Sequence, residues 1–449
     1  MFGKIKDYLR KLYIAVFYRN DTKLLTMPGK KDRDWFIVQG FVGTVFALLT
    51  GATYLTGLFN KVNAPEIVIA YLPIIGSVAG VMAIFAGYVM QTIKNRKKFT
   101  LILNTILKTL IVFIAWIPLI FPNQYASYIM IAIALIAYAL NNFMGIAINS
   151  WFVDLIDVKI RGQYMSVRNM IALIAHLLVP IIVSAFIDTS SDQYMAIVIV
   201  FTISWIVMWA ENYSFYKIYE PPLQPPKKKI KLKDVLIVPL KDRTFMKSIA
   251  SIAVFYFIWY LSMSFATLYQ LNYLGLSYTF ISISATLNVI LQFVWYPIVG
   301  KLVDRHNTDF LLIVSYILYL IQAILWGFTN ISSRYVMTIL VNIFASMAVP
   351  LFSLVVFKAK YDVIPAEDRS LYDGFYTALV ALILAVAPAI GNLMKDFIAV
   401  NMQPFGVFEV PQFQLIFMLS GILLLGLILF NMKDTVKLFR EAKERKTEN

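Results

Sequence analysis

Two stretches of the sequence carry the same polar pattern: an Asp, an Arg seven residues later, and a Tyr three residues after that. An Asp at the end of one helix and an Arg at the start of the next each face the unfavourable pole of a helix dipole, at a cost of about 0.3–1 kcal/mol. We therefore predict that the Asp and Arg of each copy pair across a turn, with the Tyr hydroxyl bonding at a polar boundary. The copies lie 208 positions apart and contain Asp154, Arg161 and Tyr164, then Asp362, Arg369 and Tyr372.

Two other titratable residues lie inside long apolar stretches. Lys108 is about ten residues into its stretch, roughly 15 Å along a helix, where it would meet an anionic substrate group or a buried partner. His176 is near the middle of another stretch and would relay protons near its ordinary pKa of about 6.5, although a satisfied core histidine is the commoner environment. No Asp or Glu is expected at mid-depth, so the sequence predicts no carboxylate-based proton or sodium site.

The composition argues against several other chemistries. The chain has no Cys and only two His, which rules out disulfides and thiol nucleophiles and leaves little for a metal site, so we expect neither metal nor cofactor. A membrane enzyme would need catalytic groups near a bilayer face, yet the predicted outer loops are short and the inner charges are mostly Lys and Arg. We therefore expect a protein that is not an enzyme.

The composition is apolar enough for a membrane protein. Hydrophobic residues make up 60% of its 449 positions and charged residues 14%, whereas soluble domains have about 25% charged residues. Runs near the length of about 20 residues needed to cross a bilayer as a helix recur along the chain. We predict twelve spans, at 35–58, 66–92, 98–121, 125–153, 163–187, 194–214, 246–271, 279–301, 309–328, 335–358, 370–395 and 411–431.

The positive charge is a topology signal. If residue 1 is cytoplasmic, 36 of the 40 Lys and Arg residues fall on the inner side of these spans. Such a bias places both termini in the cytoplasm. The formal charge of +15 therefore does not indicate a nucleic-acid partner.

Five regions follow from the spans. Residues 1–34 are predicted to form a cytoplasmic interfacial segment, and the basic linker at 215–245, which includes "EPPLQPPKKKIKLKD", is expected to lie at the membrane surface. Both would contact anionic lipids. The linker separates two six-helix bundles, at 35–214 and 246–431, and a cytoplasmic tail at 432–449 ends the chain.

An internal repeat supports this division. "KDR" precedes the first and seventh spans, at Lys31–Arg33 and Lys241–Arg243, an offset of 210. Pro180 and Pro388 lie 208 positions apart. Two six-helix repeats in the same orientation are the parallel-repeat architecture, in which substrate binds between the repeats and access alternates.

With this repeat, the chain resembles the major facilitator superfamily over nearly its full length. "GKLVDRHNTDF" is similar to a loop signature of that family, with Gly300, Asp304 and Arg305 in the matching places. Its first-half counterpart, "GYVMQTIKNRKK", keeps Gly87 but has Gln91 where the family usually has Asp. The glycine-rich signature of drug/proton antiporters and the sugar-porter signature are absent, while "DVIPAEDRSLYDGFY" is faintly similar to the cation-coupled glycoside-pentoside-hexuronide symporters.

The resemblance implies a gate on the cytoplasmic side. These signature residues and the two Asp–Arg–Tyr copies would form it, although the copies have a second interpretation as contacts that only stabilise loops. In the family, the loop Asp of one half lies near the start of helix five or eleven of the other half. We therefore expect Asp304 to contact the start of helix five, around Gly162 to Tyr164, and neutral Gln91 to offer only a weaker hydrogen bond to the start of helix eleven.

The resemblance also implies that spans one, four, seven and ten line the substrate cavity. Their aromatic, amide and hydroxyl groups suit a neutral or amphipathic solute, although such groups also make ordinary interhelical hydrogen bonds. The predicted substrate-binding residues are Gln39, Tyr54, Asn142, Asn149, Tyr256, Trp259, Tyr260, Gln270 and Asn342.

The sequence therefore predicts a transporter that moves a small organic solute by alternating access, either as a secondary active transporter or as a facilitator. We expect a monomer in the cell (plasma) membrane. Coupling to H⁺, coupling to Na⁺ and uncoupled transport all stay open. Two alternatives remain: a cation-coupled glycoside or sugar symporter, and a flippase for lipids or other amphiphiles, which the apolar cavity candidates allow.

Overall fold

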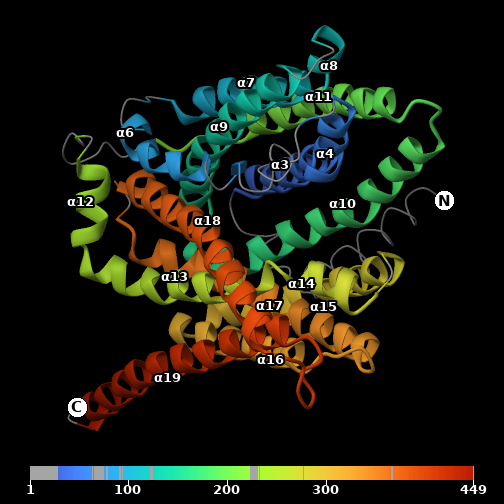
Figure 1. Ribbon diagram of the computed structural model, residues 1–449. Coiled ribbons are helices and arrows are strands. Elements are labelled where there is room, and N and C mark those ends of the chain that lie inside the picture. The colour runs from blue at the N-terminus through green and yellow to red at the C-terminus, as the bar shows by residue number, and fades with distance from the viewer. Residues whose placement is uncertain are drawn as a thin grey trace, which may run out of the picture. The chain divides into compact units, whose positions relative to one another are not determined.

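The computed structural model describes residues 29–62, 64, 75–76, 79–90, 93, 95–121, 125–222, 231, 233–276, 278–365 and 368–447 (Figure 1). Within these ranges the chain is helical and contains no strand beyond an isolated bridge between Phe405 and Phe408. The interfacial segment predicted before residue 29, most of the basic linker and Gln91 lie outside the described residues.

Nine helical stretches in the described part of the chain are long and apolar enough to cross a membrane. They correspond to predicted spans four to twelve. Four of them contain a Pro, which membrane helices tolerate when neighbours satisfy the freed backbone groups. The helices concerned are α9 (Tyr125–Leu155), α10 (Arg161–Thr189), α11 (Gln193–Lys217), α13 (Arg243–Met263), α15 (Tyr278–Arg305), α16 (Thr308–Gly327), α17 (Arg334–Val363), α18 (Arg369–Asn401) and α19 (Pro411–Thr447).

The first three predicted spans are shorter or interrupted in the structure. Span one is divided into α3 (Lys30–Leu49) and α4 (Ala52–Lys61) at Thr50, whose hydroxyl donates to the Phe46 carbonyl at 2.9 Å. Span three is divided into α7 (Arg96–Ile114) and α8 (Ile117–Ile120). Of span two, the described part includes the short helices η1 (Met82–Phe85) and α6 (Ala86–Met90).

Span seven is also irregular. α13 is followed by α14 (Ala266–Leu268) and a π-helical turn, η3 (Tyr269–Tyr273). Before it, α12 (Asp234–Lys241) forms a separate short helix that the sequence did not predict. Local polar caps fix other helix starts: the Asn95 side chain accepts from the Lys98 amide at 2.6 Å, and Asn307 accepts from the Asp309 amide at 2.8 Å.

The chain forms two compact units by its internal contacts. The first takes its described residues from 1–160, 167–242 and 364–382, and the second from 161–166, 243–363 and 383–449. The start of α10 therefore belongs to the second unit and the start of α18 to the first. The two six-helix bundles inferred from the sequence repeat differ from these units mainly at those two helix starts.

The first unit contains an apolar core, in which α11 packs against α3, α4 and α7. Phe59, Met130 and Phe201 are fully buried there, together with small Ala side chains that let the helices approach closely. The second unit has a core of aromatic rings around Phe255. The Phe255 ring centroid lies 4.3 Å from that of Phe352, 4.8 Å from Tyr319 and 5.1 Å from Tyr316.

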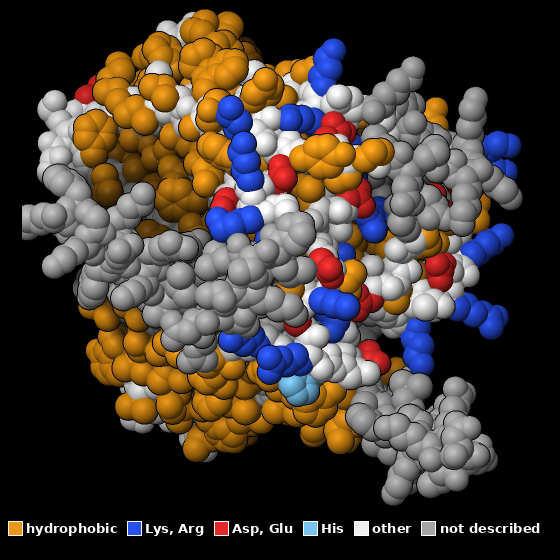
Figure 2. Space-filling view, turned by 180° about the vertical axis from the view of Figure 1, so that it is seen from behind, with side chains coloured by type: hydrophobic (Ala, Val, Ile, Leu, Met, Phe, Trp, Pro, Cys, Tyr) orange, Lys and Arg blue, Asp and Glu red, His pale blue; other side chains and the backbone are white. Residues whose placement is uncertain are grey.

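Large apolar side chains are exposed along the membrane-length helices. Ile206 on α11, Leu393 and Val400 on α18, and Phe430 on α19 are all more than half exposed. Figure 2 shows broad areas of hydrophobic side chains on the surface. Such areas are expected where lipid, and not water, surrounds the protein. The chain is a multi-pass membrane protein.

Candidate functional site

A cavity of about 630 Å³ lies within the first unit. Pockets of about 300–1,000 Å³ are typical of small-molecule sites, so this one can accept an organic solute. Its wall is formed by side chains from α3, α7, α9, α10 and α11. The larger polar side chains in that wall are Gln39, Lys108, Tyr138, Asn141, Arg168, His176 and Glu211.

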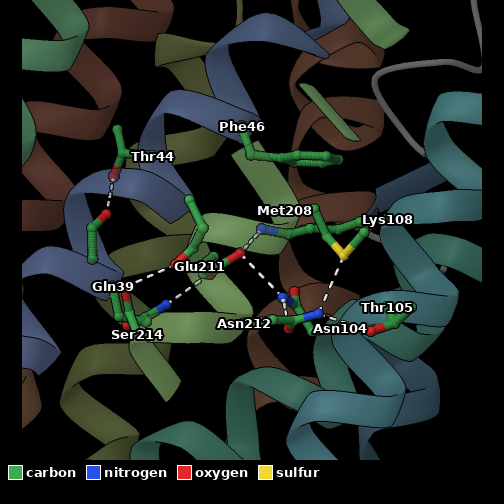
Figure 3. Close-up of polar contacts among 12 residues, drawn as sticks. Gln39, Thr44, Phe46, Asn104, Thr105, Lys108, Met208, Glu211, Asn212 and Ser214 are labelled. Carbon is green, nitrogen blue, oxygen red and sulfur yellow. Dashed lines mark hydrogen bonds and ion pairs between the residues drawn. The ribbon is translucent and has the colours of Figure 1, made fainter. Parts of the chain in front are cut away.

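A buried ion pair forms part of this wall. The Lys108 ammonium on α7 contacts the Glu211 carboxylate on α11, and the two side chains point toward one another in Figure 3. Lys108 is 4% exposed and Glu211 is 1% exposed. The ammonium also lies 4.2 Å from the centre of the Phe46 ring, within cation–π range. Lys108 therefore has a buried carboxylate partner, one of the two environments that the sequence allowed.

Glu211 is a buried carboxylate that the sequence analysis did not select. The analysis expected no Asp or Glu at mid-depth, and the predicted span ended at residue 214, which placed Glu211 near a membrane face. α11 instead continues to Lys217, and Glu211 faces α3 and α7. Buried charges are usually paired. A lysine in the apolar run of one helix therefore predicts an acidic partner in the apolar run of another, and that expectation could have identified Glu211.

Gln39 connects this ion pair to a second cation. Its amide nitrogen donates to Glu211 Oε1 at 2.8 Å, while its amide oxygen accepts from Arg168 Nη2 at 3.2 Å. Two glycines of α3 make room for these groups. A Cβ at Gly40 would lie 2.6 Å from Arg168 Nε, and one at Gly43 would lie 2.7 Å from Glu211 Oε1. These contacts run from Arg168 through Gln39 and Glu211 to Lys108. They can form beside α3 only because Gly40 and Gly43 have no side chains.

Asn104 and Asn212 support the carboxylate from its other side. Asn104 Nδ2 donates to Glu211 Oε2 at 3.2 Å and to Asn212 Oδ1 at 2.8 Å, and Asn212 Nδ2 donates to Thr105 Oγ1 at 2.8 Å (Figure 3). Asn104 Oδ1 is buried and has no hydrogen-bond partner. The Glu211 carboxylate thus accepts from Lys108, Gln39 and Asn104, which is the donor set that an ionised carboxylate requires.

His176 lies in the same cavity wall as the ion pair, although its side chain is exposed. Of the predicted substrate residues, Gln39 is in that wall, and Asn141, which the sequence analysis did not select, is there too. The Tyr54 hydroxyl lies 3.5 Å from Ser184 Oγ. Asn142 donates to the Tyr138 carbonyl of its own helix at 2.9 Å, and Asn149 donates to the Asp373 carboxylate at 3.4 Å.

The other predicted substrate residues lie in the second unit and are not among the residues that line this cavity. Tyr256 and Trp259 pack on the ring of Phe255, with centroids 5.9 and 6.2 Å away. Tyr260 contacts Tyr256, Gln270 is buried in the π-helical turn, and Asn342 donates to the Thr338 carbonyl at 2.9 Å. Most of these contacts are those of a helix-packing core.

The predicted pairing of Asp154 with Arg161 would join the two units and stays a prediction. Within the first unit, Asp154 accepts from Arg369, at the start of α18, and from Arg96 Nη1 at 2.6 Å. Arg96 is buried and also donates to Ser150 Oγ at 3.0 Å. Asp154 therefore has two arginine partners that the sequence analysis did not select.

The second copy is also divided between the units. Arg369 pairs with Asp154 in the first unit, and its predicted pairing with Asp362 stays a prediction. Arg161 lies close enough to Asp362 to interact with it electrostatically. The two tyrosines are buried, and the Tyr372 hydroxyl donates to the Asp242 carboxylate at 2.9 Å.

Asp304 caps the start of α10 within the second unit. Its two carboxylate oxygens accept from the backbone amides of Gly162 at 2.7 Å and Gln163 at 2.8 Å. Gly300 allows this close approach, because a Cβ there would lie 2.7 Å from Ser166 Cβ. The contact agrees with the placement expected from the sequence. Arg305 ends α15 and is exposed, and Gly87 lies in α6.

The described residues contain no group of three or more His, Cys, Asp or Glu side chains that could hold a metal ion. What the cavity offers is an ion pair, a second cation and several amide and hydroxyl groups. This arrangement can bind a polar or charged solute and exchange a proton at one carboxylate.

Comparison with known proteins agrees with this fold. The Major Facilitator Superfamily model matches residues 249–448. The structure of the proton:xylose symporter XylE has a TM-score of 0.65 at 12% identity, over 89% of this chain and 96% of that one. The E. coli fucose:proton symporter FucP has a TM-score of 0.62 at 13% identity, over 88% and 99%.

A human organic anion transporter, TETRAN, has a TM-score of 0.64 at 14% identity, over 90% of this chain and 100% of that one. No curated protein sequence matches the chain. At such low identities these likenesses establish a shared fold. The prediction of an all-α membrane protein with this architecture is confirmed.

Proposed function

We propose that this chain is a transporter of the major facilitator superfamily that moves a solute by alternating access, that the cavity of its first unit is the solute site, and that Glu211 couples transport to protons. The family and the structural neighbours indicate a transporter and not an enzyme. They leave the solute and the coupling ion open.

The observation that carries this proposal is the Lys108–Glu211 pair in the cavity wall. Charged side chains inside a membrane protein are expensive and mark ion or substrate pathways by default. A buried ion pair rarely stabilises a fold more than well-packed apolar residues would. Its place beside a solute-sized cavity therefore favours a role in transport over a role in folding alone.

The surroundings of Glu211 favour H⁺ over Na⁺. Hard cations take oxygen ligands in proteins, but the atoms around this carboxylate are N–H donors from Lys108, Gln39 and Asn104. A sodium ion would meet those donors, whereas a proton can bind the carboxylate directly. The neighbours XylE and FucP, whose names describe proton symporters, support the same choice.

Proteoliposomes test this proposal. Purified protein would be reconstituted with a pH-sensitive dye inside, and each solute of a library would be added outside. A transported solute should bring protons with it in the wild type. Glu211→Gln should abolish this proton flux, and Glu409→Gln, a matched change at an exposed Glu outside the cavity wall, should retain it. Proton flux that persists in Glu211→Gln would exclude Glu211 as the coupling group.

A neutral sugar is a second candidate solute. The cavity wall contains Tyr138 and Asn141, which can hydrogen-bond sugar hydroxyls, and two structural neighbours are named as sugar symporters. Sugar-induced proton uptake would support this candidate. Sodium-driven uptake instead would favour the glycoside symporters that the sequence faintly resembles.

We also propose the sidedness and the gate. Both termini, the linker, the Asp154–Arg96–Arg369 cluster and the Asp304 cap would lie on the cytoplasmic side of the plasma membrane, with the chain acting as a monomer. The distribution of Lys and Arg supports the sidedness. Reporter fusions at each terminus would test it, and an extracellular signal from either would contradict it.

A further inference from the structure

We infer that the solute carries a carboxylate or a similar oxyanion, that this anion takes the place of Glu211 on Lys108, and that Glu211 takes up the co-transported proton. The inference rests on the proposed function and adds to it a substrate class and an electroneutral stoichiometry. Three features of the first unit support it: the hydrogen-bonding capacity of Lys108, the charges of the cavity wall, and the environment of Asn104.

Lys108 has hydrogen-bonding capacity to spare. An ammonium has three N–H donors, and among the described residues Glu211 is the only acceptor that Lys108 contacts. The Phe46 ring covers another side of the ammonium. Both residues and Phe46 are in the cavity wall, so an oxyanion in the cavity would find a buried cation with donors left to give.

The cavity wall favours an anion over a cation. Among the described residues in it, Lys108 and Arg168 carry positive charge and Glu211 carries negative charge. Glu211 is already engaged by Lys108, Gln39 and Asn104, so a cationic solute would have to displace these donors. Arg168 approaches from α10, on the other side of Gln39. An anion could contact the two cations while the amide of Gln39 stays between them.

Asn104 offers a hydrogen-bond acceptor for the protonated form of Glu211. A protonated carboxyl gains an O–H donor that needs an acceptor. Asn104 Oδ1 is a buried acceptor without a partner, on the same amide whose nitrogen lies 3.2 Å from Glu211 Oε2. A half-turn of that amide exchanges its oxygen and nitrogen, so that Asn104 would accept from the carboxylic acid instead of donating to the carboxylate. The Asn212 amide, which accepts from Asn104 Nδ2 at 2.8 Å, would have to turn with it.

The step conserves charge. One proton from the outside joins one oxygen of Glu211, the contact between Lys108 and that carboxylate breaks, and the solute anion forms the replacing contact with Lys108. No covalent bond other than the new O–H forms. The cavity therefore keeps the same net charge before and after loading, which avoids the cost of an uncompensated charge inside the membrane.

The pH dependence of binding must be assigned to one group. The titratable and charged groups in the same wall as Glu211 are Lys108 on α7, Tyr138 on α9, and Arg168 and His176 on α10, while α3 contributes the uncharged Gln39 and Phe46. Of these, His176 is the group whose ordinary pKa lies near neutral pH. A His176→Gln variant is therefore needed beside any variant of Glu211.

The test is ligand-induced thermal stabilisation of the purified full-length protein at about pH 5.5 and about pH 7.5, since a ligand that binds the folded state raises its apparent stability. The probes are the anions glucuronate, gluconate, lactate and benzoate. Each is compared with an uncharged counterpart: glucose, glucitol, propanediol and benzyl alcohol. The wild type should be stabilised by at least one anion, more strongly at the lower pH, and less by its uncharged counterpart.

Three variants make the result specific. Glu211→Gln imitates the protonated state, so it should bind the same anion with nearly equal affinity at both pH values. The double variant Lys108→Gln with Glu211→Gln removes both charges without leaving one unpaired, and it should lose anion binding by about 30-fold or more. His176→Gln should keep the pH dependence of the wild type.

The opposite results would overturn the inference. These are stabilisation by none of the four anions, stronger anion binding at the higher pH, undiminished binding in the double variant, or pH dependence that disappears in His176→Gln but persists in Glu211→Gln. Proton-coupled uptake of an uncharged probe that depends on Glu211 would retain the proposed function while overturning the anionic class. The two failures are therefore distinguishable.

Discussion

The two units of this protein fill their interiors in different ways. The first places an ion pair and several amides between α3, α7 and α11, whereas the second packs rings around Phe255 between α13, α16 and α17. When α7 and α16 are aligned at their N-cap residues, Asn95 and Asn307, Leu320 takes the position in α16 that Lys108 has in α7. The difference suggests that a repeated scaffold can keep its helices while only one copy carries charge chemistry.

The largest expected effect concerns that difference directly. Glu211→Gln should abolish proton-driven accumulation of the solute, since an amide side chain cannot take up the proton that Glu211 is proposed to carry. Tyr316→Phe, which removes the hydrogen bond to Ser251 in the aromatic core of the second unit, should leave coupling intact. Accumulation in proteoliposomes with an imposed pH gradient measures both. Equal losses in the two variants would erase the contrast between the units.

The second prediction addresses the aromatic core. Phe255→Ala removes the ring that five neighbouring rings contact, and it should destabilise the protein by about 3–5 kcal/mol. The measurement is thermal unfolding in detergent. The ratio of protons to solute should not change in the protein that remains folded. A changed ratio with unchanged stability would mean that the second unit also carries coupling chemistry.

The third prediction concerns the partners of Asp154. A double-mutant cycle on Asp154→Asn and Arg369→Gln should give a coupling energy of about 1–3 kcal/mol, because neighbours within one salt-bridge network are not additive. The cycle on Asp154→Asn and Arg161→Gln should give a value near zero. Transport rate and thermal stability provide the two readouts. A larger coupling with Arg161 would favour the local pairing predicted from the sequence over the pairing with Arg369.

Sequence reasoning predicted the elements well and the partners less well. Long apolar runs identified helices such as α16 and α17 because span length is fixed by the bilayer. The division at Thr50 and the π-helical turn at Tyr269–Tyr273 were missed, since a break within an apolar run leaves little trace in composition. Partner choice depends on which helices meet. The sequence could not show that Asp154 reaches Arg369, 215 positions away.

The site was predicted only in part, again because its contacts depend on which helices meet. Lys108 and Gln39 were selected from depth and helix number, and both are in the cavity wall. Glu211 was missed because a boundary error of three residues moved it from the interior to a membrane face. The aromatic residues of span seven were polar enough to suggest a site, but packing places Trp259 against Phe255 and Tyr319. Composition alone does not separate a stacking platform from a packed core.

The smallest expected effect lies at the proposed gate, where the two halves of the repeat differ by one charge. Asp304 accepts two backbone N–H groups at the start of α10, and a carboxylate at a helix N-terminus contributes about 1 kcal/mol. Asn at this position keeps one acceptor oxygen and loses the charge. Asp304→Asn should therefore shift the conformational equilibrium several-fold toward the inward-open state, by about the factor that 1 kcal/mol gives.

Gln91 provides the matched change in the other half of the repeat. Gln91→Asp would add a carboxylate where the sequence predicts a contact with the start of α18, so it should shift the equilibrium toward the outward-open state by a similar factor. Because the chain contains no Cys, spin labels can be attached to single introduced cysteines at the predicted cytoplasmic ends of the two bundles. The distance distributions between the labels then report both populations. Shifts in the same direction for Asp304→Asn and Gln91→Asp would rule out a helix-terminus charge as the element that holds the gate.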